Sequence, residues 1–257
     1  MKFATEQSLS GLDPEDDART VLPVIADHEV THMRMRVAPT ELRSYYDRFV
    51  EALGTPVDIA EDYATDGAPT GERWSEIRFR SDVPDDVAFR HSRNAQPLHT
   101  DESYVSSPAG IMLFYCVNRA PEGGETVFVS GRRLVEFLRS NEPDLLDKLQ
   151  SIDVRYFKAA DSKQRPIVVV DEDGAVDLNY NYYCADPDQP VEARNLNQQF
   201  FELVQNGLPD DLVLPIGLDP GDAVAWRDSL VLHGRNAFQA VNTGDRFIWK
   251  TGVVLAA

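Results

Sequence analysis

A histidine and an aspartate two residues apart are the first sign of chemistry in this sequence. His99 and Asp101 lie in the segment PLHTDESY. In extended backbone, residues two apart point to the same face, so an imidazole and a carboxylate can be directed at one point. Such a pair needs a third ligand to form the facial triad of an Fe(II) site. Alone, the pair is also compatible with a surface histidine near a turn.

Further blocks along the chain carry a family resemblance. LDPGDAVAWRDSLVLHGRNAF contains His233, DRFIWK contains Arg246, and LFYCVNRAPEGGETVFVS contains Thr126. Together with PLHTDESY, these blocks resemble, in order and separation, the TauD/TfdA (taurine dioxygenase-like, clavaminate synthase-like) family of Fe(II)/2-oxoglutarate-dependent oxygenases. The resemblance covers roughly residues 90–140 and 210–254. The N-terminal third and residues 150–210 match only loosely.

The resemblance implies an iron centre. His99, Asp101 and His233 correspond to the iron ligands, which leave three coordination sites for the 2-oxoacid end of 2-oxoglutarate and for O2. The implied reaction hydroxylates an unactivated C–H bond and releases succinate and CO2. Related halogenases have a small residue in place of Asp101, so the carboxylate favours hydroxylation over halogenation. Desaturation, epimerisation and cyclisation remain open.

The resemblance also implies a site for the cosubstrate 2-oxoglutarate. Arg246 matches the arginine that binds the distal carboxylate, a role that suits a planar and permanently charged guanidinium. Thr126 matches a threonine that hydrogen-bonds the same carboxylate. We expect Arg235 to support the site from behind the iron ligands. A metal-binding jelly-roll protein without turnover and a zinc hydrolase remain alternatives, although the hydrolase would leave Thr126 and Arg246 without a role.

Residues around the triad are candidates for binding the substrate. They are Asn94, Gln96, Glu102, Tyr104 and Lys250. Lys250 shares a strand face with Arg246, where many relatives carry a second arginine, and is expected to bind an anionic group. Glu102 would bind an amine, which favours an amino acid or another amine-bearing metabolite, although strand alternation can equally turn Glu102 away. A sulfonate or phosphonate that needs only Lys250 is the alternative.

The elements that must position these residues are mainly short strands. Helices are predicted at Glu41–Leu53, at about Arg132–Leu149 with a break near Asn141–Pro143, and at about Val191–Asn206. Strands are predicted at Val57–Ala60, Trp74–Phe79, Ile111–Val117, Thr126–Ser130, Ile152–Phe157, Pro166–Val170, Ala175–Tyr180, Leu212–Ile216, Asp222–Trp226, before His233, and at Phe247–Val254. Asp173–Gly174 predicts a hairpin turn. Asn179–Cys184 could form a lid, a pocket wall or a sheet edge.

This pattern predicts an α+β protein that is mainly β. A β-sandwich or barrel core decorated by helices is expected, which the resemblance specifies as a double-stranded β-helix, or jelly roll. We expect residues 1–257 to form one domain. His28 and His32 are expected to be exposed or to serve as caps, His91 could line the cavity, and Asp222 is expected to stabilise a turn.

Composition limits the partners. The 257 residues include 25 Lys+Arg against 43 Asp+Glu, a formal net charge of −18, which makes nucleic acid an improbable partner. Cys116 and Cys184 are expected to be reduced thiols, with Cys116 buried. The N-terminus lacks an apolar signal segment and no apolar run could cross a bilayer, so a cytoplasmic protein with a small-molecule substrate and no membrane partner is expected. Homo-oligomer formation is left open.

Overall fold

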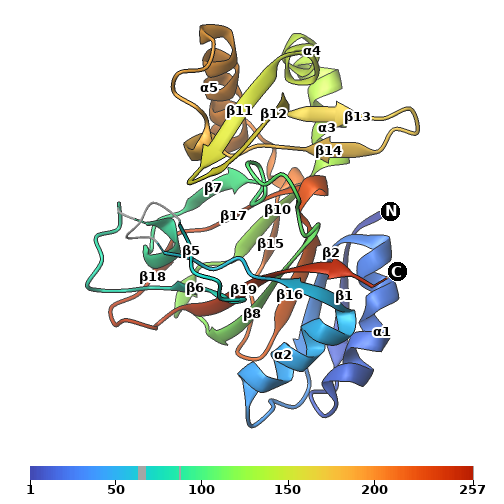
Figure 1. Ribbon diagram of the computed structural model, residues 1–257, viewed down its shortest axis with the longest axis vertical. Coiled ribbons are helices and arrows are strands. Elements are labelled where there is room, and N and C mark those ends of the chain that lie inside the picture. Colours follow the sequence, from blue (N-terminus) through green and yellow to red (C-terminus); the bar gives the residue numbers. More distant parts are fainter. Residues whose placement is uncertain (63–67, 87, 257) are drawn as a thin grey trace.

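Two β-sheets packed face to face form the centre of the protein (Figure 1). The computed structural model describes residues 1–62, 68–86 and 88–256. The larger sheet has the strand order β1-β2-β16-β8-β19-β3, with β6 also paired to β19, and the smaller sheet has the order β15-β10-β17-β7. The strands are β1 (Lys2–Leu9), β2 (His28–Met35), β3 (Gly54–Val57), β6 (Ser75–Arg78), β7 (Gln96–His99), β8 (Ile111–Asn118), β10 (Thr126–Ser130), β15 (Leu214–Ile216), β16 (Ala223–Arg227), β17 (Val231–Arg235) and β19 (Phe247–Leu255).

Alternation along the strands separates the inside of the sandwich from its outer faces. Phe114 on β8, Phe128 on β10 and Trp226 on β16 pack together between the sheets. Leu113 and Tyr115, the neighbours of Phe114, instead join a second core on the outer face of the larger sheet. Successive strand residues point to opposite faces, so one apolar run serves two cores.

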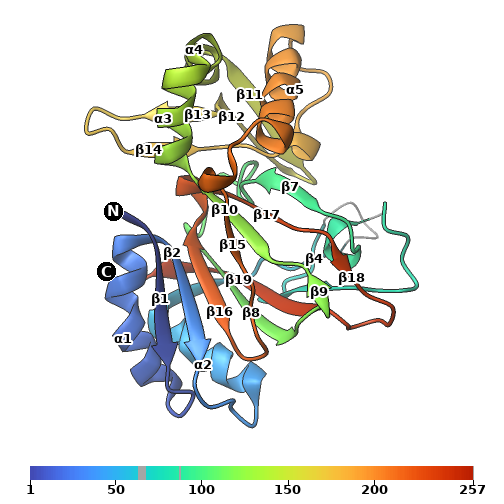
Figure 2. The same cartoon turned by 180° about the vertical axis from the view of Figure 1, so that it is seen from behind.

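Two helices cover the outer face of the larger sheet: α1 (Pro14–Asp27) and α2 (Leu42–Leu53), visible from both sides in Figures 1 and 2. The prediction of α2 is confirmed, with Tyr45, Tyr46, Phe49 and Val50 buried. Helix α1 was not predicted, nor were the parallel strands β1 and β2 that flank it. Its acidic first turn and internal proline make the helical pattern hard to recognise in the sequence, although Ala18, Val21 and Ile25 form a buried apolar stripe.

Strand β2 also corrects the expectation for His32. This side chain is buried, with Nδ1 at 3.6 Å from Glu6 Oε2 and Nε2 at 3.6 Å from Asp222 Oδ2. His28 is half-buried, with Nδ1 2.8 Å from the carbonyl oxygen of Val24. Asp222 accepts hydrogen bonds from the backbone N–H of Met35 and Asp219, at 2.9 and 3.3 Å, as expected of a residue that stabilises a turn.

A helical and hairpin layer, here called the cap (residues 131–212), lies over the outer face of the smaller sheet, at the top of Figure 1. It contains α3 (Gly131–Asn141), α4 (Pro143–Ser151), β11 (Asp153–Lys158), β12 (Asp161–Pro166), β13 (Val168–Val170), β14 (Val176–Leu178) and α5 (Val191–Asn206). The predicted break between α3 and α4 is confirmed, since Pro143 begins α4. The β13–β14 hairpin is confirmed too. Strand β12 was not predicted, because its sequence DSKQRP lacks the residues that favour strands.

Short elements connect these layers and carry part of the site. They are β4 (Glu61–Asp62), β5 (Ala68–Pro69), β9 (Glu122–Gly123), β18 (Phe238–Gln239) and the 3-10 turns η2 (Phe89–His91), η3 (Tyr182–Cys184), η4 (Asp210–Leu212) and η5 (Asp228–Leu230). Cys116 and Cys184 are not joined in a disulfide, and Cys116 is buried as expected. The helices that the structure describes include none with the length and apolar character needed to span a membrane. The prediction of an α+β jelly-roll core decorated by helices is confirmed; a single domain stays a prediction.

Candidate metal centre and active site

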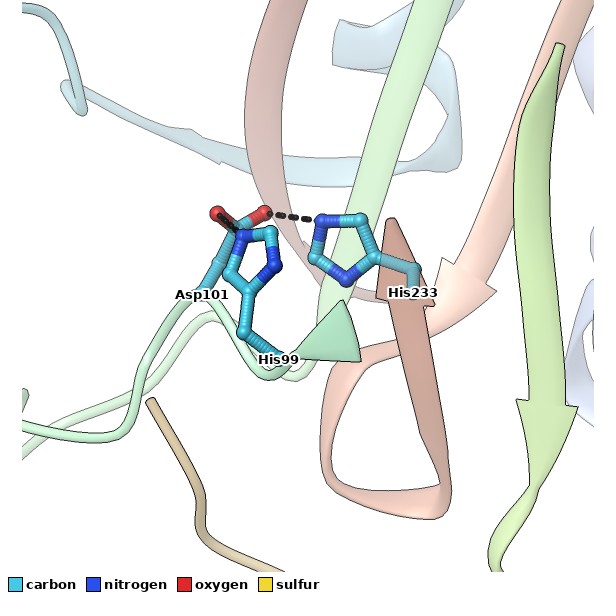
Figure 3. A group of neighbouring side chains, drawn as sticks. All are labelled: His99, Asp101 and His233. Atoms are coloured by element: carbon cyan, nitrogen blue, oxygen red, sulfur yellow. Dashed lines mark ion pairs between the residues drawn. The ribbon is translucent and has the colours of Figure 1, made fainter. Parts of the chain in front are cut away.

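The structure brings His99, Asp101 and His233 together at one edge of the smaller sheet (Figure 3). His99 ends β7 and lies directly opposite His233 in the antiparallel pairing of β7 with β17. The two ring centroids are 4.3 Å apart. Asp101 lies in the turn after β7, with Oδ1 3.6 Å from His99 Nε2 and Oδ2 3.4 Å from His233 Nε2. One potential ligand atom from each residue lies within 4.8 Å of the others.

The donor set fits a divalent metal ion. Asp101 Oδ2 is buried and has no hydrogen-bond partner among the described residues. A buried carboxylate oxygen in this state is costly unless a cation meets it. His99 Nδ1 lies 2.8 Å from the carbonyl oxygen of Pro97, a contact that orients Nε2 towards Asp101. Two imidazole nitrogens and one carboxylate oxygen are the ligand set of non-haem Fe(II) sites.

The protonation states of these ligands also suit metal binding. Burial by itself raises the pKa of Asp101, but Lys250, whose Nζ lies 2.6 Å from Oδ1, and the two histidines hold that pKa well below its ordinary value. Burial lowers the pKa of His233 well below its ordinary value. An ionised aspartate and a neutral histidine are the forms that bind metal.

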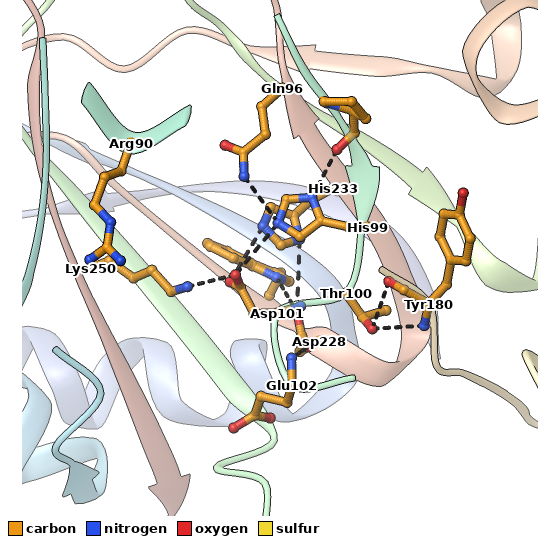
Figure 4. A network of polar contacts seen from close by, with 12 residues as sticks. Arg90, Gln96, His99, Thr100, Asp101, Glu102, Tyr180, Asp228, His233 and Lys250 are labelled. Carbon is orange, nitrogen blue, oxygen red and sulfur yellow. Dashed lines mark hydrogen bonds and ion pairs between the residues drawn. The ribbon is translucent and has the colours of Figure 1, made fainter. Parts of the chain in front are cut away.

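Asp228, which sequence analysis did not single out, organises the turn that carries Asp101 (Figure 4). Its carboxylate accepts the backbone N–H of Asp101 at 3.1 Å and of Glu102 at 2.9 Å. It also accepts the indole N–H of Trp226 at 3.2 Å and lies 3.8 Å from His233 Nδ1. Burial, together with the Asp101 and Glu102 carboxylates, raises the pKa of Asp228 to about 7. The only sequence signal was an acidic residue shortly before the apolar residues Leu230–Leu232.

Arg235 supports the opposite flank of the triad. Its Nη2 group donates to the carbonyl oxygens of Phe89, Ser92 and Asn94, at 3.1, 3.1 and 2.6 Å, and so fixes the segment that leads into β7. The side chain is buried, and burial lowers its pKa to about 9. His91, in the same segment, is buried with Nδ1 3.0 Å from the carbonyl oxygen of Arg78.

Arg246 and Thr126 lie together in a small inner pocket beside Cys116, Gly124 and Ile248. Arg246 is 3% exposed and donates from Nε and Nη2 to the Gly124 carbonyl oxygen, at 3.3 and 3.2 Å. Burial lowers its pKa to about 10. Within the described part of the chain, no acidic side chain forms an ion pair with it. A buried guanidinium of this kind fits an anionic ligand, such as a carboxylate of 2-oxoglutarate.

A larger cavity of about 750 Å³ opens from the triad between the sheets and the cap. Gln96, Tyr104 and Lys250 line it, with the Gln96 amide nitrogen 3.3 Å from His99 Nε2. Tyr182–Cys184 forms part of its wall, whereas the preceding Tyr180 is buried in the core of the cap. A role of this segment as a lid stays a prediction.

Two substrate candidates require correction. Asn94 is exposed and donates its amide to the carbonyl oxygen of Asp85 at 3.3 Å, outside the cavity. Glu102 borders the cavity, but its carboxylate accepts the backbone N–H of Ala109 at 2.6 Å and of Gly110 at 3.2 Å, and Figure 4 shows it directed away from the triad. The expectation that Glu102 binds a substrate amine is therefore not supported, because the following loop occupies the carboxylate.

Three further cavity residues were not found from the sequence. They are Glu61 on β4, Arg90 on η2 and Lys158 at the end of β11. Nothing in the sequence links them, because they come from separate segments that lie side by side only in the folded chain.

Known proteins resemble this chain in sequence and in fold. A human gamma-butyrobetaine dioxygenase is 26% identical over 157 residues, which cover 56% of this chain and 40% of the relative. The match thus spans about two fifths of that relative's length.

Solved structures share the fold. A taurine dioxygenase from Burkholderia xenovorans superimposes with a TM-score of 0.67 at 16% identity, covering 100% of this chain and 87% of the other. An asparagine oxygenase in complex with Fe(II), 3-hydroxyasparagine and succinate gives a TM-score of 0.69 at 13% identity and covers 93% and 78% of the two chains. The profile of the family described as "Taurine catabolism dioxygenase TauD, TfdA family" matches residues 4–251. The chain belongs to this family.

Proposed function

We propose that this protein is an Fe(II)/2-oxoglutarate-dependent oxygenase that hydroxylates a C–H bond of a small polar metabolite. The observation that carries the proposal is the pairing of two sites: a His–Asp–His set in which one buried carboxylate oxygen accepts no hydrogen bond from the described residues, and a buried Arg246 without an acidic partner among those residues. Bound Fe(II), with 2-oxoglutarate and O2, would supply the oxidising chemistry and release succinate and CO2.

The chain's own residues then bind, orient and exclude water. His99, Asp101 and His233 would hold the metal, while Arg246 and Thr126 would hold the distal carboxylate of 2-oxoglutarate. Lys250 neutralises Asp101 and borders the cavity in which the substrate would lie. A zinc hydrolase would use the triad but would leave the buried Arg246 without a ligand.

For the substrate, we favour an amino acid or another amine-bearing metabolite. The names of a butyrobetaine dioxygenase and an asparagine oxygenase among the similar proteins support this class. Glu102 does not support it, since its carboxylate already accepts hydrogen bonds from the backbone N–H groups of Ala109 and Gly110. A sulfonate or phosphonate would require only a cation such as Lys250. A cytoplasmic location stays a prediction, and homo-oligomer formation stays open.

Anaerobic titration with Fe(II) and 2-oxoglutarate tests the proposal. We expect a weak visible metal-to-ligand charge-transfer band that disappears in His233→Ala and persists in His28→Ala, a histidine control away from the triad. A screen for succinate release over amino acids, amines, sulfonates and phosphonates would then identify the substrate. Absence of the band in the unmodified protein would contradict the proposal, and succinate release that survives in His233→Ala would contradict the assignment of the ligands.

A further inference from the structure

Four side chains meet on the wall of the large cavity and are here called the charged cluster: Glu61, Arg90, Tyr104 and Lys158. Arg90 donates from Nη1 to the backbone carbonyl oxygen of Glu61 at 2.7 Å and from Nη2 to Glu61 Oε2 at 3.3 Å. Lys158 forms an ion pair with the same Oε2, and the Tyr104 hydroxyl donates to Oε1 at 2.8 Å. The Lys158 ammonium also lies 5.5 Å from the centre of the Tyr104 ring.

The charges in this cluster do not balance. Two cations share one carboxylate, which leaves one excess positive charge. The charged side chains are only 20%, 21% and 27% exposed for Arg90, Glu61 and Lys158, so water screens them incompletely. Both oxygens of Glu61 already accept hydrogen bonds, whereas an ammonium has three N–H donors and a guanidinium five, more than the described contacts use. The cluster is therefore better prepared for an anion than for a cation.

The position of the cluster suits one end of a small molecule. Tyr104 follows Asp101 by three residues, which cover at most about 11 Å of chain. Lys158 comes from the cap, whereas Glu61 and Arg90 come from segments that flank the sheets, so the cluster joins two walls of the cavity. It is separate from the inner pocket of Arg246, and Lys250 is already engaged with Asp101.

We propose that Arg90 and Lys158, held in place by Glu61 and Tyr104, bind a carboxylate of the substrate. This inference rests on the proposed function, because it assumes that the substrate reacts at the triad. A guanidinium and an ammonium side by side match the two oxygens of a carboxylate, and Glu61 keeps the two cations together when no substrate is bound. A carboxylate anchored here leaves the rest of a small molecule free to reach the triad.

Calorimetric titration tests the inference on protein loaded anaerobically with Fe(II) and 2-oxoglutarate. The probes are the standard L-amino acids, each paired with its decarboxylated amine, for example L-lysine with cadaverine. We expect at least one amino acid to bind at concentrations up to about 10 mM and its amine to bind at least about tenfold more weakly, since the amine lacks the charge-assisted hydrogen bonds.

Variants separate recognition from structural support. Lys158→Met and Arg90→Gln should each weaken binding of that amino acid by about tenfold or more and leave the affinity for its amine unchanged. Lys158→Arg should retain most of the preference and guards against misfolding of Lys158→Met. Arg93→Gln is the matched control, because Arg93 is an exposed arginine of the same segment, paired with Asp85 and outside the cavity.

Four results would overturn the inference: equal affinity for acid and amine, unchanged affinity for the amino acid in Lys158→Met and Arg90→Gln, loss of affinity for both acid and amine in these variants, or no binding of any amino acid in the panel. If the charge-transfer band forms and one of these results follows, only the carboxylate site is wrong. If the band itself is absent, the proposed function fails and the inference fails with it.

Discussion

At the scale of single residues, a substitution of Arg246 tests most directly where 2-oxoglutarate binds. The guanidinium of Arg246 is buried, and its hydrogen bonds go to a single carbonyl oxygen, so the protein alone does little to offset the cost of burying this charge. A bound carboxylate would supply the missing negative charge. The same reasoning does not apply to Arg119, which also lines the small inner pocket of Arg246. Arg119 is about half exposed, and its guanidinium pairs with the Asp219 carboxylate at 2.7 Å.

Arg246→Ala should therefore weaken 2-oxoglutarate binding by about 2–5 kcal/mol, at least tenfold, because a buried charge-assisted pair is lost. Fe(II) binding without 2-oxoglutarate should remain nearly intact. Thr126→Val should cost only about 0.5–1.5 kcal/mol, the net value of one neutral hydrogen bond. Anaerobic titration calorimetry measures both changes, with Arg119→Ala as the control. An unchanged affinity in Arg246→Ala would place the cosubstrate elsewhere.

At the scale of elements, the turn after β7 depends on η5 for its shape. Asp228 accepts the N–H groups of both Asp101 and Glu102, so it positions the turn that carries Asp101 without belonging to the triad itself. Asp228→Asn replaces one acceptor oxygen by a donor. We expect about 10–100-fold weaker metal binding, as for other residues that orient metal ligands, with the fold retained.

Asp211→Asn, at an exposed aspartate on η4, is the control. Metal titration followed by calorimetry measures the effect, and unchanged affinity would remove Asp228 from this role.

The turn between β1 and α1 depends on a second buried aspartate. Asp17 accepts the N–H groups of Ser10 and Gly11 at 2.8 and 2.9 Å and the Tyr45 hydroxyl at 2.6 Å. Burial opposes its ionisation, but these hydrogen bonds prevail and lower its pKa below 3.8. Because the folded-state pKa lies below the unfolded value, the stabilisation is complete above about pH 4 and is lost as pH falls through the folded-state pKa.

Asp17→Asn should lower the free energy of unfolding by about 1.5–3 kcal/mol near neutral pH, the range for hydrogen bonds to a charged group. The difference from the unmodified protein should shrink as the pH falls below about 4. Urea denaturation at several pH values measures it. Asp16→Asn changes an exposed ion pair next to it and should have a much smaller effect. A difference that does not vary with pH would show that the charge of Asp17 is unimportant.

At the scale of the whole molecule, ligands that bind only the folded state should stabilise it. Fe(II) and 2-oxoglutarate at about 100 times their dissociation constants should each add about 2.7 kcal/mol. For a chain of this size, that corresponds to a rise in Tm of about 5–10 °C. A chelator should reverse the increment from the metal, and Arg246→Ala should lose only the increment from 2-oxoglutarate. Scanning calorimetry under argon measures both. No rise in Tm with either ligand would contradict the assigned sites.

Much of the architecture followed from local pattern. Alternating apolar residues predicted strands such as β8 and β10, a proline predicted the break between α3 and α4, and an Asp-Gly pair predicted the β13–β14 hairpin. These signals are local, because periodicity and turn chemistry depend on residues close in sequence. Spacing singled out His99 and Asp101, the family resemblance added His233, and the structure brings these three side chains together.

Tertiary structure decided what local pattern could not. Glu102 turns towards the N–H groups of Ala109 and Gly110, an outcome set by the path of the loop rather than by strand alternation. Asp228 reaches the triad from η5, and the charged cluster joins the cap to the segments that flank the sheets. The sequence does not reveal such contacts, because a buried charge must find a partner that is close in space, and residues far apart in sequence come close only when the chain folds.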